Sequence, residues 1–420
     1  MALVATTTNV VRIPYWRLSG FYFFYFALVG ALSPFLGLYL SDIGFTAYAI
    51  GLVNAVLMGT KIVAPNLWGW LCDYTGRRLF IILLGSALST VFFAGLFFWQ
   101  ELLPILIITF LYSFFWNAVL SQFDTVTIQY LGKDSHRYSQ IRVWGSIGFI
   151  VSVVLLGFLF DLFSIRYLIP IAWVLLVLIT INCALLTQPP SSKKLTSSIS
   201  CKTIISQPAV IAFFAAVFLL QLSFGAYYTF FSLYLESYGY SRTMIGFLWA
   251  LGVLAEVLLF LIIHRLMPAV GVSYLLFWSL VLTSFRWFLT AFFADVLWVI
   301  VFAQAIHAFS FGAAHAASIE LIRQFFKGKN AGQGNALYSS VTFGVGGAIG
   351  AIASGFLWEV NPQLLFIVAA VVLLLAAVIT RMGLCGDAIE NFHLTINALV
   401  GNKRENNKLV IDNPAKNDSH

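Results

Sequence analysis

Apolar stretches of about 20 residues, the length that spans a bilayer as a helix, recur along this whole chain between short polar segments. Within lipid, only helices and closed barrels satisfy every backbone polar group. Barrel strands would alternate over about ten residues, whereas these runs are continuously apolar. The sequence therefore predicts an all-α integral membrane protein with twelve transmembrane helices. We place them at residues roughly 14–41, 46–71, 79–99, 103–131, 138–160, 165–187, 208–238, 241–265, 271–294, 296–323, 331–358 and 361–384.

The composition excludes a water-soluble globule. Of the 420 residues, 61% are hydrophobic and only 9% are charged, which leaves too little polar surface to cover a soluble protein of this size. The first predicted helix begins too late and is too long for a cleavable signal, so we expect it to stay as an anchor. The four cysteines lack the spacing of metal ligands, and we predict no metal site and no cofactor.

The basic residues are distributed unequally between the two sets of loops. Of the 23 Lys and Arg, eighteen lie in the chain ends and in the loops after even-numbered spans, where cytoplasmic segments collect such residues. Only Arg166 and Arg242 lie in the opposite loops, while Lys61, Arg142 and Arg286 lie in or at the mouth of predicted helices. Both ends of the chain are therefore predicted to be cytoplasmic. The net charge of +7 has a topological cause, and we expect no nucleic-acid partner.

The chain repeats itself at an offset of 195 residues. LYLSDIGFTAYAIGL, which begins at Leu38, matches LYLESYGYSRTMIGF, which begins at Leu233. A second pair, GFLFD and GFLWE, begins at Gly157 and Gly355, at nearly the same offset. Six-plus-six repeats of this kind, with a polar linker between them, are typical of the major facilitator fold. We predict one six-helix half at residues 1–187 and a second at residues 208–385, joined by a cytoplasmic linker at residues 188–207. A disordered cytoplasmic tail is predicted at residues 386–420.

The loop after the second span carries the most specific motif. Its sequence, GWLCDYTGRR at residues 69–78, resembles the loop motif of the major facilitator superfamily. Gly69 allows close helix approach, Asp73 can pair with a helix end and Gly76 makes the turn. The resemblance implies that these residues, with Arg77 and Arg78, gate one conformation. Ordinary positive-inside charges beside a tight turn would explain only the two arginines.

Seven ionisable side chains are placed inside the hydrocarbon region of the bilayer by the predicted spans. Such a group costs about 3 kcal/mol on insertion scales, so each one is a candidate for the functional site. The alternative for each is a structural ion pair or a side chain that reaches the membrane surface. The two histidines, eight residues apart, lie about 80° around a helix and can line one wide face. The seven are Lys61, Asp124, Arg142, Glu256, Arg286, His307 and His315.

The start of the fifth span, RVWGSIGF at residues 142–149, resembles that of the lactose permease family. There the matching arginine, an acidic partner in helix four and an aromatic residue contact sugar. The resemblance therefore implies substrate contact for Arg142, Asp124 and Phe149. Asp124 and Arg142 also carry opposite charges on adjacent spans and could pair with each other, either to bind a polar solute or to hold the two helices together. The aromatic residue of that family is tryptophan, and a phenylalanine cannot donate its hydrogen bond. A sugar substrate is for this reason not favoured.

Three segments of the second half resemble the phenylpropionate permease group, also described as nucleoside-proton-symporter-like. They are GFLWALGVLAEVLLF, SFRWFL and QAIHAFSFGAAHAAS. The resemblance extends over roughly residues 15–385 and implies a bacterial inner-membrane carrier, with aromatic acids as the named substrate class. Substrate contacts in this half are assigned to Arg286, His307 and His315.

The coupling proton needs a carrier other than the one in lactose permease. That family has a glutamate three residues after the histidine that matches His307, whereas this chain has Ser310. A carboxyl group in apolar surroundings favours its protonated form, so we assign the proton to Glu256 in helix eight. His307 is assigned to coupling as well, because an imidazole ionises near neutral pH. Lys61 is included because the offset of 195 residues places it at the position of Glu256.

These patterns predict a secondary active transporter that takes up a small organic solute with protons by alternating access. Candidate solutes are an aromatic or other organic acid, a nucleoside or a siderophore-like compound, and export of a small molecule is the alternative. A membrane enzyme or sensor is not favoured, because the loops are short and no Ser, His and acid cluster is visible. We expect a monomer whose partners are the substrate, the proton and the lipid bilayer.

Overall fold

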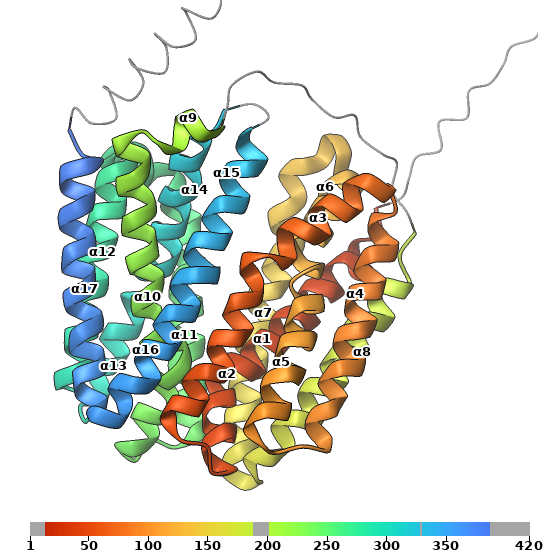
Figure 1. The fold of residues 1–420 in the computed structure, drawn as a ribbon, viewed down its shortest axis with the longest axis vertical. Helices are drawn as coiled ribbons and strands as arrows, with labels where there is room; N and C mark the ends of the chain where they lie inside the picture. The colour runs from red at the N-terminus through yellow and green to blue at the C-terminus, as the bar shows by residue number, and fades with distance from the viewer. Residues whose placement is uncertain (1–12, 188–200, 328–329, 387–420) are drawn as a thin grey trace, which may run out of the picture.

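A computed structural model describes residues 13–187, 201–327 and 330–386, and the regular structure in these ranges is helical (Figure 1). Residues 387–420 of the predicted tail, and residues 188–200 of the predicted linker, lie outside the described residues. The α-helices are α1 (Tyr15–Asp42), α2 (Ala47–Gly59), α3 (Ala64–Thr75), α4 (Arg78–Phe93), α5 (Leu102–Trp116), α6 (Val119–Leu131), α7 (Tyr138–Leu162), α8 (Leu168–Ala184), α9 (Cys201–Ile205), α10 (Pro208–Ser237), α11 (Arg242–Val270), α12 (Val272–Phe292), α13 (Leu297–Ala305), α14 (Ala314–Phe325), α15 (Asn330–Ser339), α16 (Gly347–Val360) and α17 (Pro362–Gly383).

Eleven helical stretches in the described part of the chain are long and apolar enough to cross a membrane. One of them, Leu102–Leu162, has 61 residues. As a straight helix it would be about 90 Å long, three times the thickness of a bilayer core. The backbone breaks between α6 and α7, where Gly132 has a φ of +50° and Asp134 leaves the helical region. Splitting the stretch there would give twelve spans, the number that the sequence predicts, and this number stays a prediction.

Two stretches contain π-helical segments that the sequence analysis did not predict. Ala308–Ala313 joins α13 to α14, and Ser340–Gly346 joins α15 to α16. A π-helical turn holds more residues than an α-helical turn, and such turns are frequent at functional sites. The first segment lies between the two candidate histidines.

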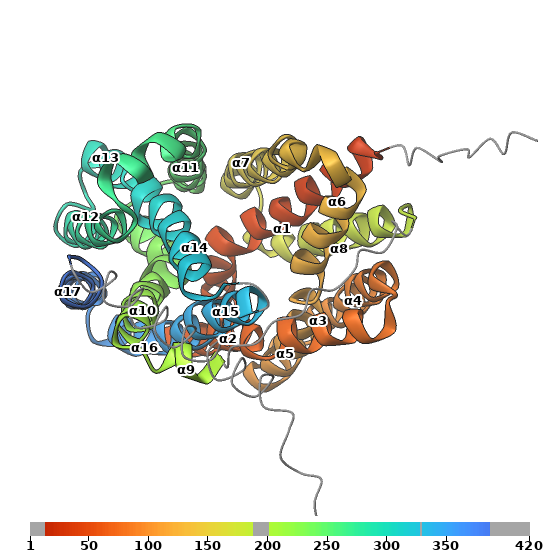
Figure 2. The same ribbon diagram turned by 90° about the horizontal axis from the view of Figure 1, so that it is seen from above.

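The helices form two groups. Helices α1 to α8 gather on one side of the molecule and α10 to α17 on the other (Figures 1 and 2). We call them the first and second group. Helices α1, α2 and α7 of the first group pack against α10, α11 and α16 of the second. The boundaries of the predicted halves and linker stay a prediction.

The sequence repeat is visible in the local structure. Gly44 and Gly239 make the turns before α2 and α11, with φ values of +92° and +85° that favour glycine. Two residues later, the hydroxyls of Thr46 and Ser241 accept hydrogen bonds from backbone N–H groups in the first turn of each helix. Equivalent positions therefore build the same turn and cap. We name the two ends of the molecule after the turns that they carry, the Gly44 end and the Gly76 end.

Close backbone contacts hold α1 against α7. A Cβ atom at Gly148 would overlap the carbonyl oxygen of Phe23, and one at Gly30 would lie 2.9 Å from that of Phe149. In lipid, helices associate mainly through such van der Waals contacts, which small residues permit.

Gly148→Ala should lower the free energy of unfolding by about 1–3 kcal/mol, because the added methyl group forces the two backbones apart. Gly332→Ala on α15 is the matched control, since a Cβ atom there meets nothing within 4 Å. The control should be neutral or stabilising by up to about 1 kcal/mol, because alanine favours the helix. Unfolding in mixed detergent micelles measures both, and equal losses would contradict the assignment.

Candidate functional site

The carboxylate of Asp124, on α6, receives two tyrosine hydroxyl groups. Tyr22 of α1 donates to Oδ1 at 2.6 Å, and Tyr138 of α7 donates to the same oxygen at 2.8 Å. The sequence analysis proposed that Asp124 and Arg142 could pair with each other. Both residues contact Tyr22, but they form no ion pair in the described structure. Asp124 is therefore satisfied by neutral donors.

The guanidinium of Arg142, on α7, lies against aromatic rings. It is 5.3 Å from the ring centre of Tyr22 and 4.1 Å from that of Phe26. Gly145 leaves room for it, because a Cβ atom there would lie 2.7 Å from Nη1. Ring faces attract a cation but accept few of its hydrogen bonds. The arrangement leaves donors of Arg142 for another group.

Phe149 lies two helical turns beyond Arg142 and is buried in the hydrophobic core. Its backbone faces Gly30 of α1. It is on the same face of α7 as Arg142, but no ring contact of Phe149 is found among the described residues. Its assignment as a substrate contact stays a prediction.

In the second group, Arg286 on α12 is only 1% exposed. Nη2 donates to Oε1 of Gln304 at 2.6 Å, and Nη1 lies 3.1 Å from Nδ1 of His307. The guanidinium also lies 4.4 Å from the ring centres of both Tyr227 and Trp287. No acidic side chain pairs with it in the part of the chain that the structure describes. Arg286 is therefore a buried cation that is held by neutral partners.

Gln304 adds an unused donor to this cluster. The side chain is 1% exposed, and its Nε2 atom has no hydrogen-bond partner among the described residues. Its Oε1 atom accepts from Arg286 and, at 3.4 Å, from the hydroxyl of Tyr227. An unpaired buried donor costs about 1–3 kcal/mol, so a ligand acceptor next to Arg286 would relieve this cost.

The two candidate histidines stack on one phenylalanine. The ring centre of Phe311 is 6.2 Å from that of His307 and 5.7 Å from that of His315, with interplanar angles of 12° and 9°. The histidines therefore do share one face, as predicted. His307 reaches Arg286, whereas Nδ1 of His315 lies 3.2 Å from the hydroxyl of Tyr338 on α15.

Glu256 lies half-buried on α11, where its Cγ atom packs beside Gly312 of the first π-helical segment. Its carboxylate has no hydrogen bond or ion pair within the described residues. Helix α11 packs against α7, which carries Arg142, and against the first π-helical segment, which lies between His307 and His315. The packing therefore brings together helices of both groups that carry predicted site residues.

Lys61 lies apart from Glu256, in the 3₁₀ turn Thr60–Ile62 between α2 and α3. Its Nζ atom is 3.3 Å from the sulfur of Met58 and 5.9 Å from the ring centre of Phe343, in the second π-helical segment. The ring of Phe343 is in turn 6.3 Å from that of His315. His307, Phe311 and His315 form one stack, which we call the histidine ladder. Lys61, in the first group, is therefore linked to this ladder through Phe343.

The motif at residues 69–78 forms the turn between α3 and α4. Gly76 ends α3 with a φ of +67°, which confirms its role in the turn. Arg78 pairs with Asp73 at 2.8 Å and also donates to Gln122 on α6. A Cβ atom at Gly69 would lie 3.4 Å from Gln122, so this residue does face a neighbouring helix. The gating role of the motif, including Arg77 at the start of α4, stays a prediction.

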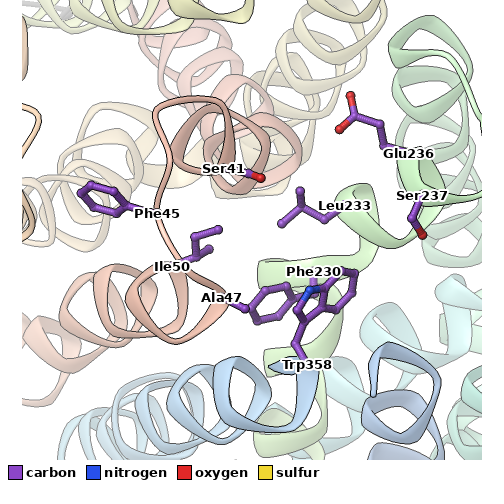
Figure 3. A pocket seen from close by; sticks show the side chains of 9 residues that line it. All are labelled: Ser41, Phe45, Ala47, Ile50, Phe230, Leu233, Glu236, Ser237 and Trp358. Atoms are coloured by element: carbon purple, nitrogen blue, oxygen red, sulfur yellow. The ribbon is translucent and has the colours of Figure 1, made fainter. Parts of the chain in front are cut away.

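A cavity of about 420 Å³ lies at the Gly44 end, between the turn from α1 to α2 and the ends of α10 and α16 (Figure 3). None of the predicted site residues lines it. A much smaller cavity of about 10 Å³ lies between α2, α10 and α16. The walls of the larger one are Ser41, Phe45, Ala47, Ile50, Phe230, Leu233, Glu236, Ser237 and Trp358.

The structure adds polar partners that the sequence analysis missed. Gln304 lies three residues before His307, so polar spacing along one helix could have revealed it. Tyr22, Tyr138 and Tyr227 carried no comparable signal, because the chain has 17 tyrosines and the partners lie on other helices. Only the packing of helices selects these three.

Comparisons with known proteins show a family and a common fold for this chain. A profile of the MFS_1 like family matches residues 15–368. The chain is 28% identical to the "Probable 3-phenylpropionic acid transporter" of Escherichia coli (strain K12), over 84% of this chain and 93% of that protein. It is 27% identical to the "Maltose permease" of Geobacillus stearothermophilus, over 85% and 93%. The crystal structure of the nucleoside transporter NupG superposes with a TM-score of 0.73 and 19% identity, over 89% and 98%, which shows a common fold.

Proposed function

The chain belongs to the MFS_1 like family, and we propose that it takes up a small organic anion together with protons by alternating access. Its fold and its relatives make it a membrane transporter of small organic substrates and not an enzyme. The proposed parts are the anionic substrate, the proton and the direction of transport.

The charged side chains within the helical spans carry the proposal. Lys61, Arg142 and Arg286 form no ion pair with an acidic side chain among the described residues. Asp124 is held by two tyrosines, and the carboxylate of Glu256 has no polar partner in the described ranges. Three cations against two carboxylates leave one net positive charge, or two when Glu256 is protonated. Such charges act strongly in a low-dielectric interior, so the region favours an anion.

Aromatic rings beside the cations favour an aromatic acid within this class. Arg142 lies over Phe26, and Arg286 lies between Tyr227 and Trp287. Arginine binds a carboxylate through two parallel hydrogen bonds, and the adjacent rings can stack on the apolar part of the ligand. The relative named as a 3-phenylpropionic acid transporter is consistent with this substrate class.

The packing of α11, which carries Glu256, against α7, which carries Arg142, supports proton coupling. While ionised, Glu256 would compete with an anionic substrate for the charge of Arg142. Protonation removes this competition, so the substrate binds more tightly to the protonated protein. By thermodynamic reciprocity, bound substrate also favours protonation of Glu256. Anion and proton would therefore enter together.

A nucleoside is the second candidate substrate. Asn54 and Gln221 are buried amide side chains that border the small cavity, next to Phe224 and Tyr228. Amides can hydrogen-bond a base while aromatic rings stack on it.

Export is the alternative to uptake. An exporter would use the same residues with the substrate loaded from the other face of the membrane.

A ligand screen followed by transport assays tests the proposal. Purified protein is screened by thermal shift against aromatic acids, nucleosides, sugars and iron chelates, and hits are assayed in proteoliposomes. We expect an aromatic acid to raise the melting temperature and to accumulate when the outside is more acidic than the inside. Accumulation that persists after a protonophore collapses the gradient would overturn proton coupling. Binding of nucleosides without binding of acids would overturn the substrate class.

A further inference from the structure

Two acidic side chains join the two groups of helices at the Gly44 end. Asp161, near the end of α7, accepts hydrogen bonds from the backbone N–H groups of Arg242 at 2.8 Å and Thr243 at 2.9 Å, which open α11. Glu359, near the end of α16, accepts from the backbone N–H of Tyr48 at 3.0 Å, in the first turn of α2. In each contact, a carboxylate from one group caps a helix of the other.

Glycines bring the helices of each contact close together. A Cβ atom at Gly157 on α7 would lie 2.5 Å from the carbonyl oxygen of Arg242, and one at Gly355 on α16 would lie 2.8 Å from that of Ala47. Gly246 on α11 and Gly51 on α2 face the backbones of their partner helices equally closely. A larger residue at these positions would separate the carboxylates from the amides that they cap.

The two pairs of repeated sequence segments form the two sides of these contacts. GFLFD, which contains Asp161, meets the repeat segment that begins at Leu233, and GFLWE, which contains Glu359, meets the segment that begins at Leu38. The repeat therefore builds one contact twice, around a pseudo-twofold axis. If an interface is duplicated, the segments on both of its sides are repeated. This explains why two separate pairs of segments share nearly the same offset.

Arg242 strengthens one of the two contacts. It is one of only two basic residues in the loops predicted to lie opposite the cytoplasmic side. Its Nε atom donates to Glu236 at 2.9 Å, and its Nη1 atom donates to the carbonyl oxygen of Phe160 in the other group at 3.2 Å. The other such residue, Arg166, pairs with Asp42 at 3.0 Å within the first group. Only one of these two ion pairs therefore bears on the interface.

We propose that Asp161 and Glu359 are positioning residues of transport, which set the balance between the two access states by capping helices of the opposite group. The inference rests on the alternating access proposed above. A carboxylate at a helix N-terminus is stabilised by unpaired N–H groups and by the helix dipole. These caps exist only while the groups meet at the Gly44 end. When this end opens, both partners turn to water and the stabilisation is lost.

Alanine at either position should shift the ratio of the closed to the open Gly44 end by about tenfold toward open, which is the size of a lost helix cap. The double variant should shift it by about a hundredfold, because both contacts act on the same equilibrium. Alanine suits the last turn of a helix, so Asp161→Ala and Glu359→Ala are compatible with the fold. Asp42→Ala is the matched control, because its ion pair lies within one group.

Spin labels at the Gly44 end measure the shift. Phe163 and Phe293 are 55% and 47% exposed and follow α7 and α12, in different groups. Both are replaced with cysteine in a full-length chain without its four native cysteines, and the distance distribution is recorded by double electron–electron resonance in lipid nanodiscs. Longer distances should grow in each alanine variant, most in the double variant, and stay unchanged in Asp42→Ala.

The double variant decides the outcome. A distribution identical to that of the unmodified acids would overturn the proposal, as would an equal shift in Asp42→Ala. Glu359→Gln keeps the accepting oxygen and should restore most of the closed population, which a nonspecific loss of stability would not do. No substrate is needed, so failure to find a transported solute leaves this test intact. If transport is demonstrated and the distances do not change, only the role of the two acids fails.

Discussion

Replacing Arg286 with glutamine is expected to lower kcat/KM for substrate uptake by at least about thirtyfold. Arg286 is the buried cation of the second group, and it orients Gln304 and His307 through its two terminal nitrogens. Truncating one partner of a buried, charge-assisted contact costs about 2–5 kcal/mol, which corresponds to a factor of 30 or more. An anionic substrate would lose its anchor together with the orientation of these two neighbours.

The same substitution should leave the protein as stable as before, or more stable. No carboxylate offsets the burial of this guanidinium in the described structure, and neutral replacements of buried charges are often stabilising. Arg286→Lys keeps the charge but loses the planar fork, so we expect at least a tenfold loss of uptake.

The matched control is Arg381→Gln, which removes an exposed arginine that lies 5.7 Å from the ring centre of Tyr274. This variant should transport normally. Initial rates in proteoliposomes, with melting temperatures of the same preparations, separate activity from folding. Normal kcat/KM in Arg286→Gln would remove Arg286 from the site.

Glu256→Gln should abolish accumulation driven by a pH gradient while leaving substrate exchange within about threefold. Glutamine resembles the protonated acid in shape and cannot ionise, so the carrier would behave as permanently loaded with its proton. The loaded forms interconvert during exchange, whereas net uptake also requires the proton to leave. Steady-state accumulation and counterflow in the same proteoliposomes measure the two processes.

Asp124→Asn provides the contrast for this experiment. Asp124 is already held by two tyrosine hydroxyls, so its neutralisation should weaken substrate binding in accumulation and exchange alike. If Glu256→Gln still concentrates substrate against its gradient, the coupling proton must reside elsewhere, and the histidine ladder becomes the next candidate.

The sequence was sufficient for features that depend on neighbouring residues. Hydrophobic length located the helices, and the turn at Gly76 followed from a local motif, because its φ of +67° favours glycine. The sequence also singled out the charged side chains within the spans, and their roles stay predictions. Their partners could not be predicted, because those depend on which helices pack together. The proposed pairing of Asp124 with Arg142 is replaced by contacts of both residues with Tyr22, which lies more than 100 residues earlier in the chain.

Other features had no sequence signal that we could interpret. The π-helical segments depend on how the groups pack, since helical periodicity alone predicts an uninterrupted α-helix through both. The caps made by Asp161 and Glu359 also join residues far apart in the chain. The sequence repeat revealed that the segments were related, and only the structure revealed that they touch.

The π-helical segment Ala308–Ala313 has a mechanical consequence. This π-helical turn can become α-helical if its one extra residue moves further along the chain. The helix beyond the turn then rotates by about 100° relative to α13. His315 would then leave the stack while His307 stays beside Arg286. A change of winding within one span would thus move one imidazole of the ladder and leave the other in place.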